Sequence, residues 1–324
     1  MTVIIPMRNE RLAIGRCVES VLASTLPVEL ALEVLVLDGE SSDDSAAIVT
    51  AIAARDPRVQ LLPNPDRLQA AAFNRGLAAA SGDYIVRMDA HSWYAPDYLS
   101  ESVRLLRETG AGNVGGVQRA EGTSLVSRAI AAAVSSRFAA GDAKYRNATE
   151  AAFTDTVYLG AWRSETLRAL GGMRTDWAVN EDYEMNIRLR ATGATVYLSP
   201  TIRSVYQVRG SLPKLARQYL RYGFWKVRTL LHHPASLRWR QAVAPAFVLS
   251  LLLTPLFVHW FGWLGLSHVA LYLVANASAS ALTARKSSWP LLPVLPLVFA
   301  VIHMSWGIGF WCGVFYWPVT QGRQ

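Results

Sequence analysis

Acidic side chains recur where apolar runs end in the first part of the chain. Glu10, Asp38, and the pair Asp89 and His91 each follow such a run. If the runs are strands of a parallel sheet, their carboxyl ends share one edge, where ligands bind. An acidic rim suits a metal ion, or the hydrogen-bond donors of a sugar or a base. It suits bare nucleic-acid phosphates poorly.

One pair of these residues could hold a metal ion. Asp89 and His91 flank a single residue, so in a turn after a strand both can point to the same side. Mg²⁺ and Mn²⁺ favour oxygen ligands, and Mn²⁺ accepts imidazole more readily. The sequence has no glycine-rich phosphate loop of either common kind, so a divalent cation or basic side chains must meet phosphate charge. An ordinary turn is the alternative for this triplet.

Strands and helices that would position these residues alternate along the chain. Apolar runs bounded by polar turn residues predict strands at 2–6, 32–37, 59–62 and 84–88, with helices at 10–23, 42–54 and 69–80. Strands separated by helices form a parallel sheet with crossover helices. We therefore predict an α/β fold with its site at the carboxyl edge of the sheet.

Charge is divided unevenly along the 324 residues. All 24 acidic residues lie at or before Glu184, and 14 of the 32 Lys and Arg residues follow it, within a net charge of +8. The basic half is also the apolar half, so we expect no nucleic acid as a partner. Two cysteines, Cys17 and Cys312, exclude a disulfide scaffold, and no Cys/His cluster has the spacing of a metal finger.

Two stretches near the C-terminus carry no charged side chain, at 242–284 and 287–322, and only Arg285 and Lys286 separate them. About 20 apolar residues cross a bilayer. We therefore predict about three transmembrane helices, at 242–260, 264–283 and 291–317. Buried core helices of a soluble protein are the alternative.

Tryptophans and basic residues flank these predicted spans. Trp260, Trp263 and Trp289 lie at span ends, where aromatic belts form. Arg238 and Arg240 precede the first span. If the first two spans form a hairpin, the basic clusters share one side, which the positive-inside rule places in the cytoplasm. We expect a multi-pass inner-membrane protein with a cytoplasmic catalytic part. Three spans would leave the C-terminus outside, and a re-entrant last stretch is the alternative that changes this. No signal peptide is expected, because the opening apolar run is short.

Five motifs, in order, are similar to those of family 2 glycosyltransferases. They are VIIPMRNE from Val3, VLDGESSD from Val36, NRG from Asn74 with SGDYIVRMDAH from Ser81, NEDYE from Asn180, and Q-x-x-R-Y from Gln218. The resemblance covers residues 1–225. The D-A-H triplet and the apolar C-terminal region look most like exopolysaccharide glucosyltransferases of the succinoglycan (ExoA-like) type.

The resemblance implies a GT-A fold, a Rossmann-like mixed sheet with helices on both faces. It also implies a nucleotide-sugar donor such as UDP-glucose and a polyprenyl-diphosphate-linked acceptor at the cytoplasmic leaflet. The enzyme would invert the anomeric carbon, in exopolysaccharide or cell-envelope glycan synthesis. Membrane lipids and other glycan-assembly proteins are further expected partners. The implied domains are a catalytic part at 1–210, an amphipathic interfacial segment at 211–240 and a transmembrane part at 241–324.

Residue roles follow from the same resemblance. Pro6, Glu10 and Asp38 would form the nucleoside pocket, where Asp38 could accept a hydrogen bond from uracil. A partner of a helix N-cap is the alternative role of Asp38. Asp89 and His91 would hold the divalent cation, Mn²⁺ or Mg²⁺, that bridges the diphosphate. The usual metal motif ends in Asp, so His91 is a departure that bears on the identity of the metal.

The implied general base is Asp182, with Glu181 as the alternative. A solvated helix start is the alternative role of these acids. Asn74 is expected to bind substrate, and Trp162, in an expected strand at 158–163, could stack on a sugar ring. A core helix is expected at 124–140.

The last motif adds Gln218, Arg221 and Tyr222 as substrate-binding residues, with Arg221 as a clamp on the diphosphate. The family usually has Trp where this chain has Tyr222, which argues against processive synthesis. The surrounding segment is basic and aromatic, and such a composition fits a helix lying on anionic lipid.

Two further functions stay open. Transfer of one sugar to polyprenyl phosphate differs from the first hypothesis only in the acceptor. A non-catalytic glycan-assembly subunit is the other, although the intact Asp89, Asp182 and Arg221 argue against it.

Overall fold

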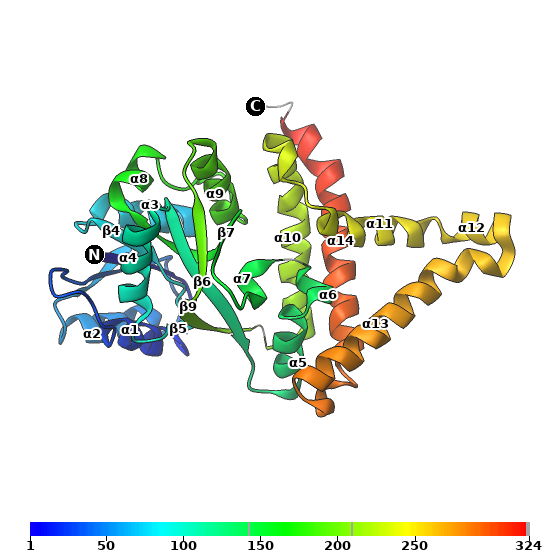
Figure 1. Ribbon diagram of the computed structural model, residues 1–324, viewed down its shortest axis with the longest axis horizontal. Coiled ribbons are helices and arrows are strands. Elements are labelled where there is room, and N and C mark those ends of the chain that lie inside the picture. Colours follow the sequence, from blue (N-terminus) through cyan, green and yellow to red (C-terminus); the bar gives the residue numbers. More distant parts are fainter. Residues whose placement is uncertain (142, 209, 322–324) are drawn as a thin grey trace. The chain divides into compact units, whose positions relative to one another are not determined.

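The computed structural model describes residues 1–141, 143–208 and 210–321. They form two compact units, which are described separately: Met1–Arg119 with Lys144–Gln207, and Ala120–Ala143 with Val208–Gln324 (Figure 1). The first unit contains all the predicted site residues before the last motif. The boundary between the two units differs from the boundary expected at residue 210, because residues 120–143 belong with the C-terminal helices.

The described residues of the first unit form a nine-stranded mixed sheet. Its strands are β1 (Thr2–Met7), β2 (Glu33–Asp38), β3 (Val59–Pro63), β4 (Tyr84–Arg87), β5 (Ser92–Tyr94), β6 (Asn113–Glu121), β7 (Ala152–Thr154), β8 (Tyr158–Arg163) and β9 (Val196–Gln207). Their order is β3-β2-β1-β4-β8-β6-β9-β5, and β7 pairs with β9.

The first half of the sheet is parallel, as predicted. Strand β1 pairs in parallel with β2 and β4, and β2 pairs with β3. The crossover helices are α1 (Ile14–Leu22), α2 (Ser45–Ala53) and α3 (Gln69–Ala79). Buried side chains alternate between the two faces along β1, where Val3 and Ile5 join one core cluster and Ile4 joins the other. The predicted strands and helices in this half are confirmed, with ends shifted by a few residues.

The second half of the sheet is antiparallel, because β8 runs against both β4 and β6. A register shift interrupts the pairing of β8 with β6, and there Leu159 and Gly160 have φ angles of +59° and +145°. This irregularity is a β-bulge, which breaks the side-chain alternation of the strand. The remaining helices of this unit are α4 (Tyr98–Thr109), α7 (Lys144–Asn147), α8 (Ser164–Ala169) and α9 (Glu181–Ala191).

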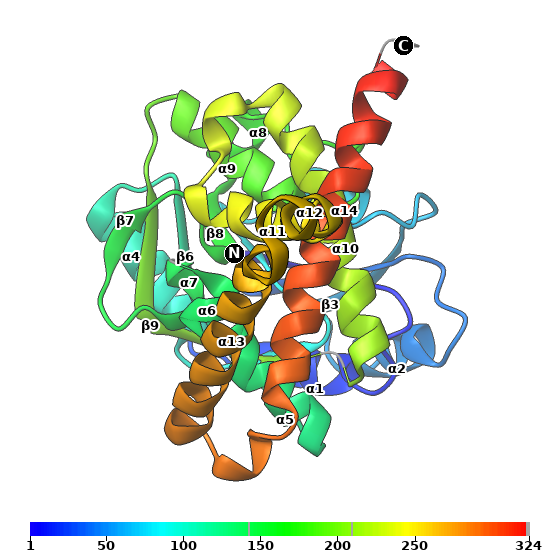
Figure 2. The same cartoon turned by 90° about the vertical axis from the view of Figure 1, so that its right-hand side faces the viewer.

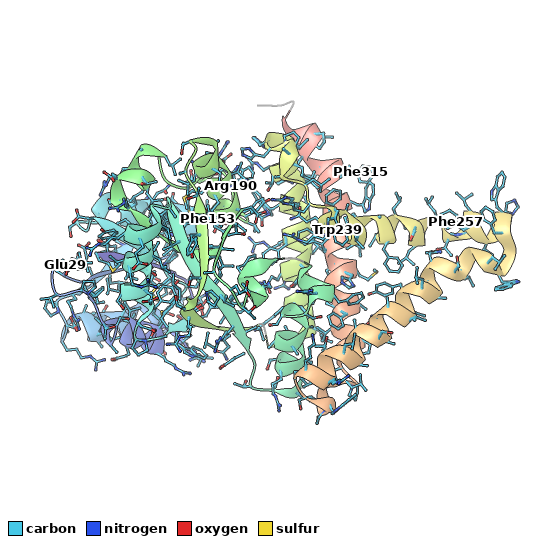
Figure 3. All side chains as sticks on the ribbon, viewed as in Figure 1. Glu29, Phe153, Arg190, Trp239, Phe257 and Phe315 are labelled. Carbon is cyan, nitrogen blue, oxygen red and sulfur yellow. The ribbon has the colours of Figure 1, made fainter. Side chains whose placement is uncertain are left out.

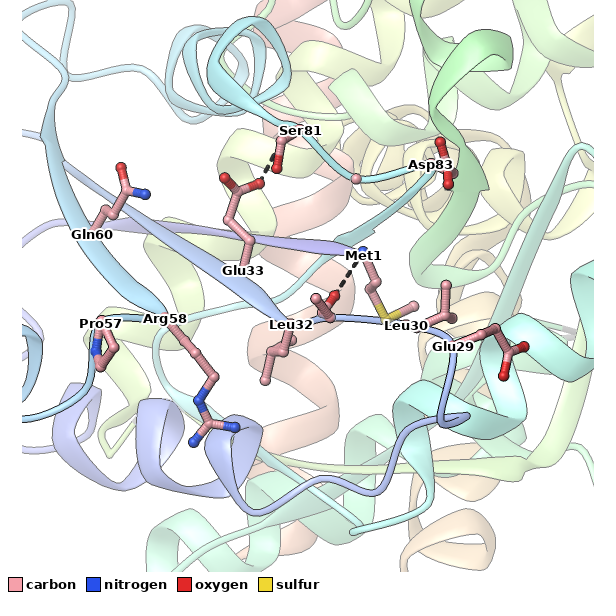
Figure 4. A pocket seen from close by; sticks show the side chains of 12 residues that line it. Met1, Glu29, Leu30, Leu32, Glu33, Pro57, Arg58, Gln60, Ser81 and Asp83 are labelled. Carbon is pink, nitrogen blue, oxygen red and sulfur yellow. Dashed lines mark hydrogen bonds between the residues drawn. The ribbon is translucent and has the colours of Figure 1, made fainter.

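An open hollow of about 490 Å³ lies at the amino ends of β1 and β2 (Figure 4). Glu33 accepts a hydrogen bond from the backbone N–H of Ser81 at 3.0 Å, and the amino group of Met1 donates to the carbonyl of Ala31 at 2.9 Å. Ligands of parallel sheets bind at the carboxyl ends of strands, so this hollow is at the edge opposite the expected site.

The second unit is helical. It contains α5 (Leu125–Val134), α6 (Arg137–Ala140), α10 (Leu212–His232), η1 (Pro234–Ser236), α11 (Trp239–Leu252), α12 (Thr254–Phe261), η2 (Gly262–Leu266), α13 (Ser267–Lys286), η3 (Trp289–Leu291) and α14 (Leu295–Gln321). The helix expected at 124–140 is therefore two helices. Figures 1 and 2 show α10 beside α14, and in Figure 1 α11 and α12 leave this pair while α13 returns.

Two segments of the described chain are long and apolar enough to cross a membrane, Thr254–Lys286 and Leu295–Val319. Three spans are therefore not confirmed. The first expected span, at 242–260, is divided between α11 and α12, where Pro255 occupies the first turn of α12. Large apolar side chains on these helices are exposed, including Trp239 at 76% and Phe315 at 74% (Figure 3).

Candidate active site

The predicted site residues of the first unit gather at the carboxyl edge of the parallel strands. In the register of β1 with β2, Met7 lies opposite Asp38, and Glu10 follows in the next loop. Asp89 and His91 follow β4, the other neighbour of β1. The central position of β1 in this group brings the three loops to one edge of the sheet.

Asp89 is held by side chains from three other elements. The hydroxyl of Tyr158 donates to Oδ2 of Asp89 at 3.0 Å, and Nε2 of Gln69 lies 3.3 Å from Oδ1. Burial raises the pKa of Tyr158, so its hydroxyl stays protonated and able to donate. The backbone N–H of Asp89 donates to the hydroxyl of Tyr94 at 2.7 Å. Tyr158 and Gln69 were not predicted as site residues.

His91 meets a residue from the first motif. Its Nδ1 lies 3.5 Å from Oε1 of Glu10, and its ring packs edge-on against Tyr206 with 5.2 Å between centroids. Two predicted site residues that are far apart in sequence are thus in contact. No group of three or more His, Cys, Asp or Glu side chains that could hold a metal by itself occurs among the described residues.

Arg87, the last residue of β4, connects the metal motif to the base motif. It is 5% exposed, and its Nη2 lies 3.3 Å from Oε1 of Glu181 and 3.7 Å from Oδ1 of Asp89. Burial alone would lower the pKa of Arg87, but the charges of Glu181 and Asp89 raise it, so the guanidinium remains protonated. Its Nε and Nη1 have no hydrogen-bond partner within the described residues.

Glu181 and Asp182 begin α9, after Asn180 in the left-handed conformation with φ +66°. Glu181 is 5% exposed and faces Arg87, and burial raises its pKa while Arg87 opposes the rise. Asp182 is more exposed, and its Oδ1 accepts a hydrogen bond from the backbone N–H of Tyr183 at 2.7 Å. The positive end of the helix dipole stabilises acids at these positions.

The third acid of this turn, Glu184, is fully buried. It pairs with Arg188 at 2.8 Å, and Arg188 also donates to the carbonyls of Leu170 at 2.8 Å and Gly172 at 2.7 Å. These bonds fix the turn before α9 to the helix. Asp182 is therefore the acid of this turn with the most access to a substrate.

The loops after β1 and β2 are tied together. The hydroxyl of Ser41 donates to Oδ1 of Asp38 at 2.6 Å, and the backbone N–H of Ser42 donates to the side chain of Asn9 at 2.8 Å. Pro6 lies beside Leu37 in the strand register. The expected nucleoside-pocket residues thus share one edge, with Asp38 already bonded to its own loop.

The position of Trp162 corrects one expectation. This side chain is fully buried and packs edge-on against Phe73, with 5.8 Å between ring centroids, so it has no face for a sugar ring. The bulge at Leu159 and Gly160 is the reason, because it lets Tyr158 reach Asp89 while Trp162 enters the core on the other face.

Asn74 also differs from its expected role. Its Nδ2 donates to the carbonyl of Met173 at 2.7 Å, and its Oδ1 accepts from the N–H of Met173 at 2.8 Å. Both ends of the amide are thus used to hold the turn that precedes α9. Asn74 acts here as a structural residue.

Gln218, Arg221 and Tyr222 lie on α10 in the second unit. Nε2 of Gln218 donates to the hydroxyl of Tyr222 at 2.8 Å, and Arg221 is exposed. Their contact with substrate stays a prediction.

A mixed sheet with acids at its carboxyl edge, joined through Arg87 to an acidic helix start, defines a class: a glycosyltransferase with the GT-A fold. The sequence matches the models of glycosyl transferase family 2 over residues 2–158 and glycosyl transferase family group 2 over residues 84–316. The chain belongs to glycosyltransferase family 2.

The succinoglycan biosynthesis protein ExoA of Rhizobium meliloti (strain 1021) is 31% identical over 315 residues, which are 95% of this chain and 93% of that protein. A dolichyl N-acetyl-alpha-D-glucosaminyl phosphate 3-beta-D-2,3-diacetamido-2,3-dideoxy-beta-D-glucuronosyltransferase of Methanococcus voltae is 25% identical over 97% of both chains. A mannosyltransferase of Pyrobaculum calidifontis, solved with GDP-Man and Mn²⁺, superposes with a TM-score of 0.59 at 21% identity, over 96% of this chain and 87% of that one. The similarity to the mannosyltransferase shows a shared fold only.

Proposed function

We propose that this chain is a membrane-attached inverting glycosyltransferase. It moves a sugar, glucose from UDP-glucose, to a polyprenyl-diphosphate-linked saccharide in exopolysaccharide or cell-envelope glycan synthesis. One observation carries the proposal: of the three acids that begin α9, Glu181 and Glu184 are directed inward to arginines, and Asp182 has the greater access.

Asp182 is the general base of this proposal. Its carboxylate accepts the proton of the acceptor hydroxyl while that oxygen bonds to the anomeric carbon. The bond from the anomeric carbon to the diphosphate breaks on the opposite face, which inverts the configuration. Asp38 holds the uracil, and the role of Arg221 as a clamp on the diphosphate stays a prediction from the family resemblance.

Asp89 and His91 fit a divalent cation that is shared with the donor. A carboxylate and an imidazole leave coordination positions for diphosphate oxygens, as is usual for such ions, and Glu10 stands next to His91. When bound, the cation neutralises negative charge on the leaving group. The mannosyltransferase from Pyrobaculum calidifontis, whose fold is similar, was solved with Mn²⁺.

The acceptor and the membrane location rest on different support. One relative takes part in succinoglycan biosynthesis, and the other acts on a dolichyl-linked sugar phosphate. Exposed apolar side chains on the helices of the second unit favour insertion into lipid. We place the protein in the inner membrane with the catalytic unit on the cytoplasmic side, where nucleotide sugars are available.

Asp182→Asn tests this mechanism. We expect the turnover number to fall by about 10²–10⁴, the range for loss of a general base, while the donor still protects the protein against thermal unfolding. Purified protein in lipid is incubated with a panel of nucleotide sugars and two acceptors, a polyprenyl phosphate and a polyprenyl-diphosphate-linked saccharide. Asp176→Asn, at an exposed ion pair with Arg174, is the matched control.

Near-normal turnover of Asp182→Asn would remove Asp182 as the base. Transfer to the polyprenyl phosphate alone would replace the proposed acceptor. No transfer by the native protein from any donor would favour a non-catalytic assembly subunit. Full activity of the native enzyme in excess chelator would refute the metal role of Asp89 and His91.

A further inference from the structure

Helices α10 and α14 of the second unit touch through their backbones. A Cβ atom added to Gly309 would lie 2.1 Å from the carbonyl oxygen of Leu220, and one added to Gly313 would lie 2.6 Å from that of Phe224. On the facing helix, a Cβ on Gly223 would lie 2.2 Å from the carbonyl oxygen of Trp306. Small residues at such positions let two helices pack closely along their length. Along the pair, Leu220 meets Gly309, Phe224 meets Gly313 and Arg228 meets Trp317, so the two helices run parallel.

The basic side chains of α10 restrict where the pair of α10 and α14 can lie in a bilayer. Lys214, Arg217 and Arg221 are exposed, and their spacing of three and four residues places them on one face of the helix. Arg228 stacks over the ring of Trp317, at 4.9 Å from its centroid. Cations within the hydrocarbon of a bilayer are costly, so α10 cannot cross it. Because α14 lies along α10, it cannot cross independently, although its length and apolar composition would allow it.

The exposed side of α14 is mostly apolar. Ile308, Cys312, Phe315 and Val319 are exposed and recur every three or four residues, which forms a stripe, and Tyr316 and Pro318 are exposed beside it. Gly309 and Gly313, on another side of the helix, face α10. The basic side chains of α10 suit the headgroups of an anionic bilayer, and the apolar side chains of α14 suit its acyl chains. The two helices packed side by side therefore match the chemistry of such a bilayer surface.

The long apolar segment before α14 is a hairpin. Helices α11 and α12 lead away from the pair, η2 turns the chain, and α13 returns (Figure 1). Trp260, Phe261 and Trp263 at the turn are each at least 64% exposed. Arg238 and Arg240 stand at one end of the hairpin, and Arg285 and Lys286 at the other. This distribution favours entry of the apolar turn into lipid while both basic ends stay on one side.

We propose that α10 and α14 lie together along the surface of an anionic phospholipid bilayer, and that the α11–α13 hairpin alone enters it. The C-terminal end of α14 then stays on the side of the catalytic unit, whereas three spans would place it on the opposite side. This inference rests on the membrane attachment in the proposed function.

Cysteine labelling tests the proposal. Cys312 is replaced by Ser, a single cysteine is appended after Gln324, and Cys17 stays in place because it is fully buried. A membrane-impermeant maleimide is applied to sealed vesicles of either orientation. Val28→Cys, at a fully exposed position of the first unit, marks the side of the catalytic unit.

We expect the C-terminal cysteine and the Val28→Cys marker to react in the same vesicle orientation. In vesicles of the opposite orientation, we expect neither cysteine to be labelled. Reaction of the C-terminal cysteine in the opposite orientation from the marker would overturn the proposal, because α14 would then cross. Sugar transfer is measured in the same vesicles. Transfer with opposite labelling refutes only the topology, and same-side labelling without transfer refutes only the proposed function.

Discussion

Arg87 in the first unit and Lys226 in the second are almost inaccessible, at 5% and 2% exposed, yet their neighbours differ. Arg87 faces the carboxylates of Glu181 and Asp89. Nζ of Lys226 donates to the carbonyl and the hydroxyl of Ser236, at 3.1 and 3.3 Å. No acidic residue follows Glu184 in the chain, so helices α10–α14 contain none themselves.

This difference bears on how strongly the stability of each unit depends on its buried cation. Removing one member of a buried ion pair leaves the other charge uncompensated in the interior. Removing a cation bound to neutral oxygens leaves polar groups that lose hydrogen bonds, which is a smaller loss. We therefore expect the first unit to be sensitive to the loss of its buried cation and the second to tolerate it.

Arg87→Met is the strongest test of the comparison. It should lower the free energy of unfolding by about 3–5 kcal/mol, because Glu181 and Asp89 lose a buried partner. Denaturant titration of the protein in detergent measures the loss. The double variant Arg87→Met with Glu181→Gln should recover part of it, since Gln carries no charge. A loss within about 0.5 kcal/mol, as for ordinary surface changes, would show that the pair does not hold β4 to α9.

Gly309→Ala tests the packing of the second unit. The added methyl group would overlap the carbonyl of Leu220, so we expect a loss of about 1–3 kcal/mol, as for overpacked interiors. The control is Gly210→Ala, because an added Cβ there meets no atom within 4 Å. Thermal unfolding in detergent gives both values. Equal midpoints for the two variants would mean that α10 and α14 are not packed backbone to backbone.

Lys226→Met should be milder than Arg87→Met. We expect a loss of about 1 kcal/mol, since neutral oxygens of Ser236 lose one donor and the methionine side chain fills the space. The same denaturant titration applies. A loss as large as that of Arg87→Met would break the comparison, because it would reveal an uncompensated charge in the second unit.

The last test of the comparison concerns pH. Burial raises the pKa of Glu181 above its ordinary value of 4.5, so the folded state keeps this proton to higher pH than the unfolded chain. Stability from this group is present below pH 4.5 and is lost as the pH rises through the folded pKa, by at most about 1.4 kcal/mol per pH unit. Glu181→Gln lacks the titration.

The stability of the native protein relative to Glu181→Gln should thus fall as the pH rises from about 4.5 toward 7. Denaturant midpoints at several pH values measure this difference. Asp176→Asn, at an exposed pair, provides the reference without a buried titration. A difference that stays constant with pH would contradict the raised pKa.

Much of the site follows from local patterns. Glu10, Asp38, Asp89 and His91 could be predicted because each follows an apolar run, and parallel strands end at one edge. Arg87 was missed, although a charged residue inside the apolar run at 84–88 is a signal that a partner must exist. Gln69 gave no signal, because a polar residue at the start of a helix is common.

The sequence by itself determined the parallel half of the sheet, the acidic edge and the apolar C-terminal region, because periodicity and residue type act locally. Only the tertiary structure decided that Tyr158 faces Asp89 and that Trp162 is buried, because a bulge in β8 changes which side chains share a face. It also decided that α14 packs along the basic α10. Length and hydropathy describe one helix at a time, whereas the backbone contact of Gly309 exists only when the two helices meet.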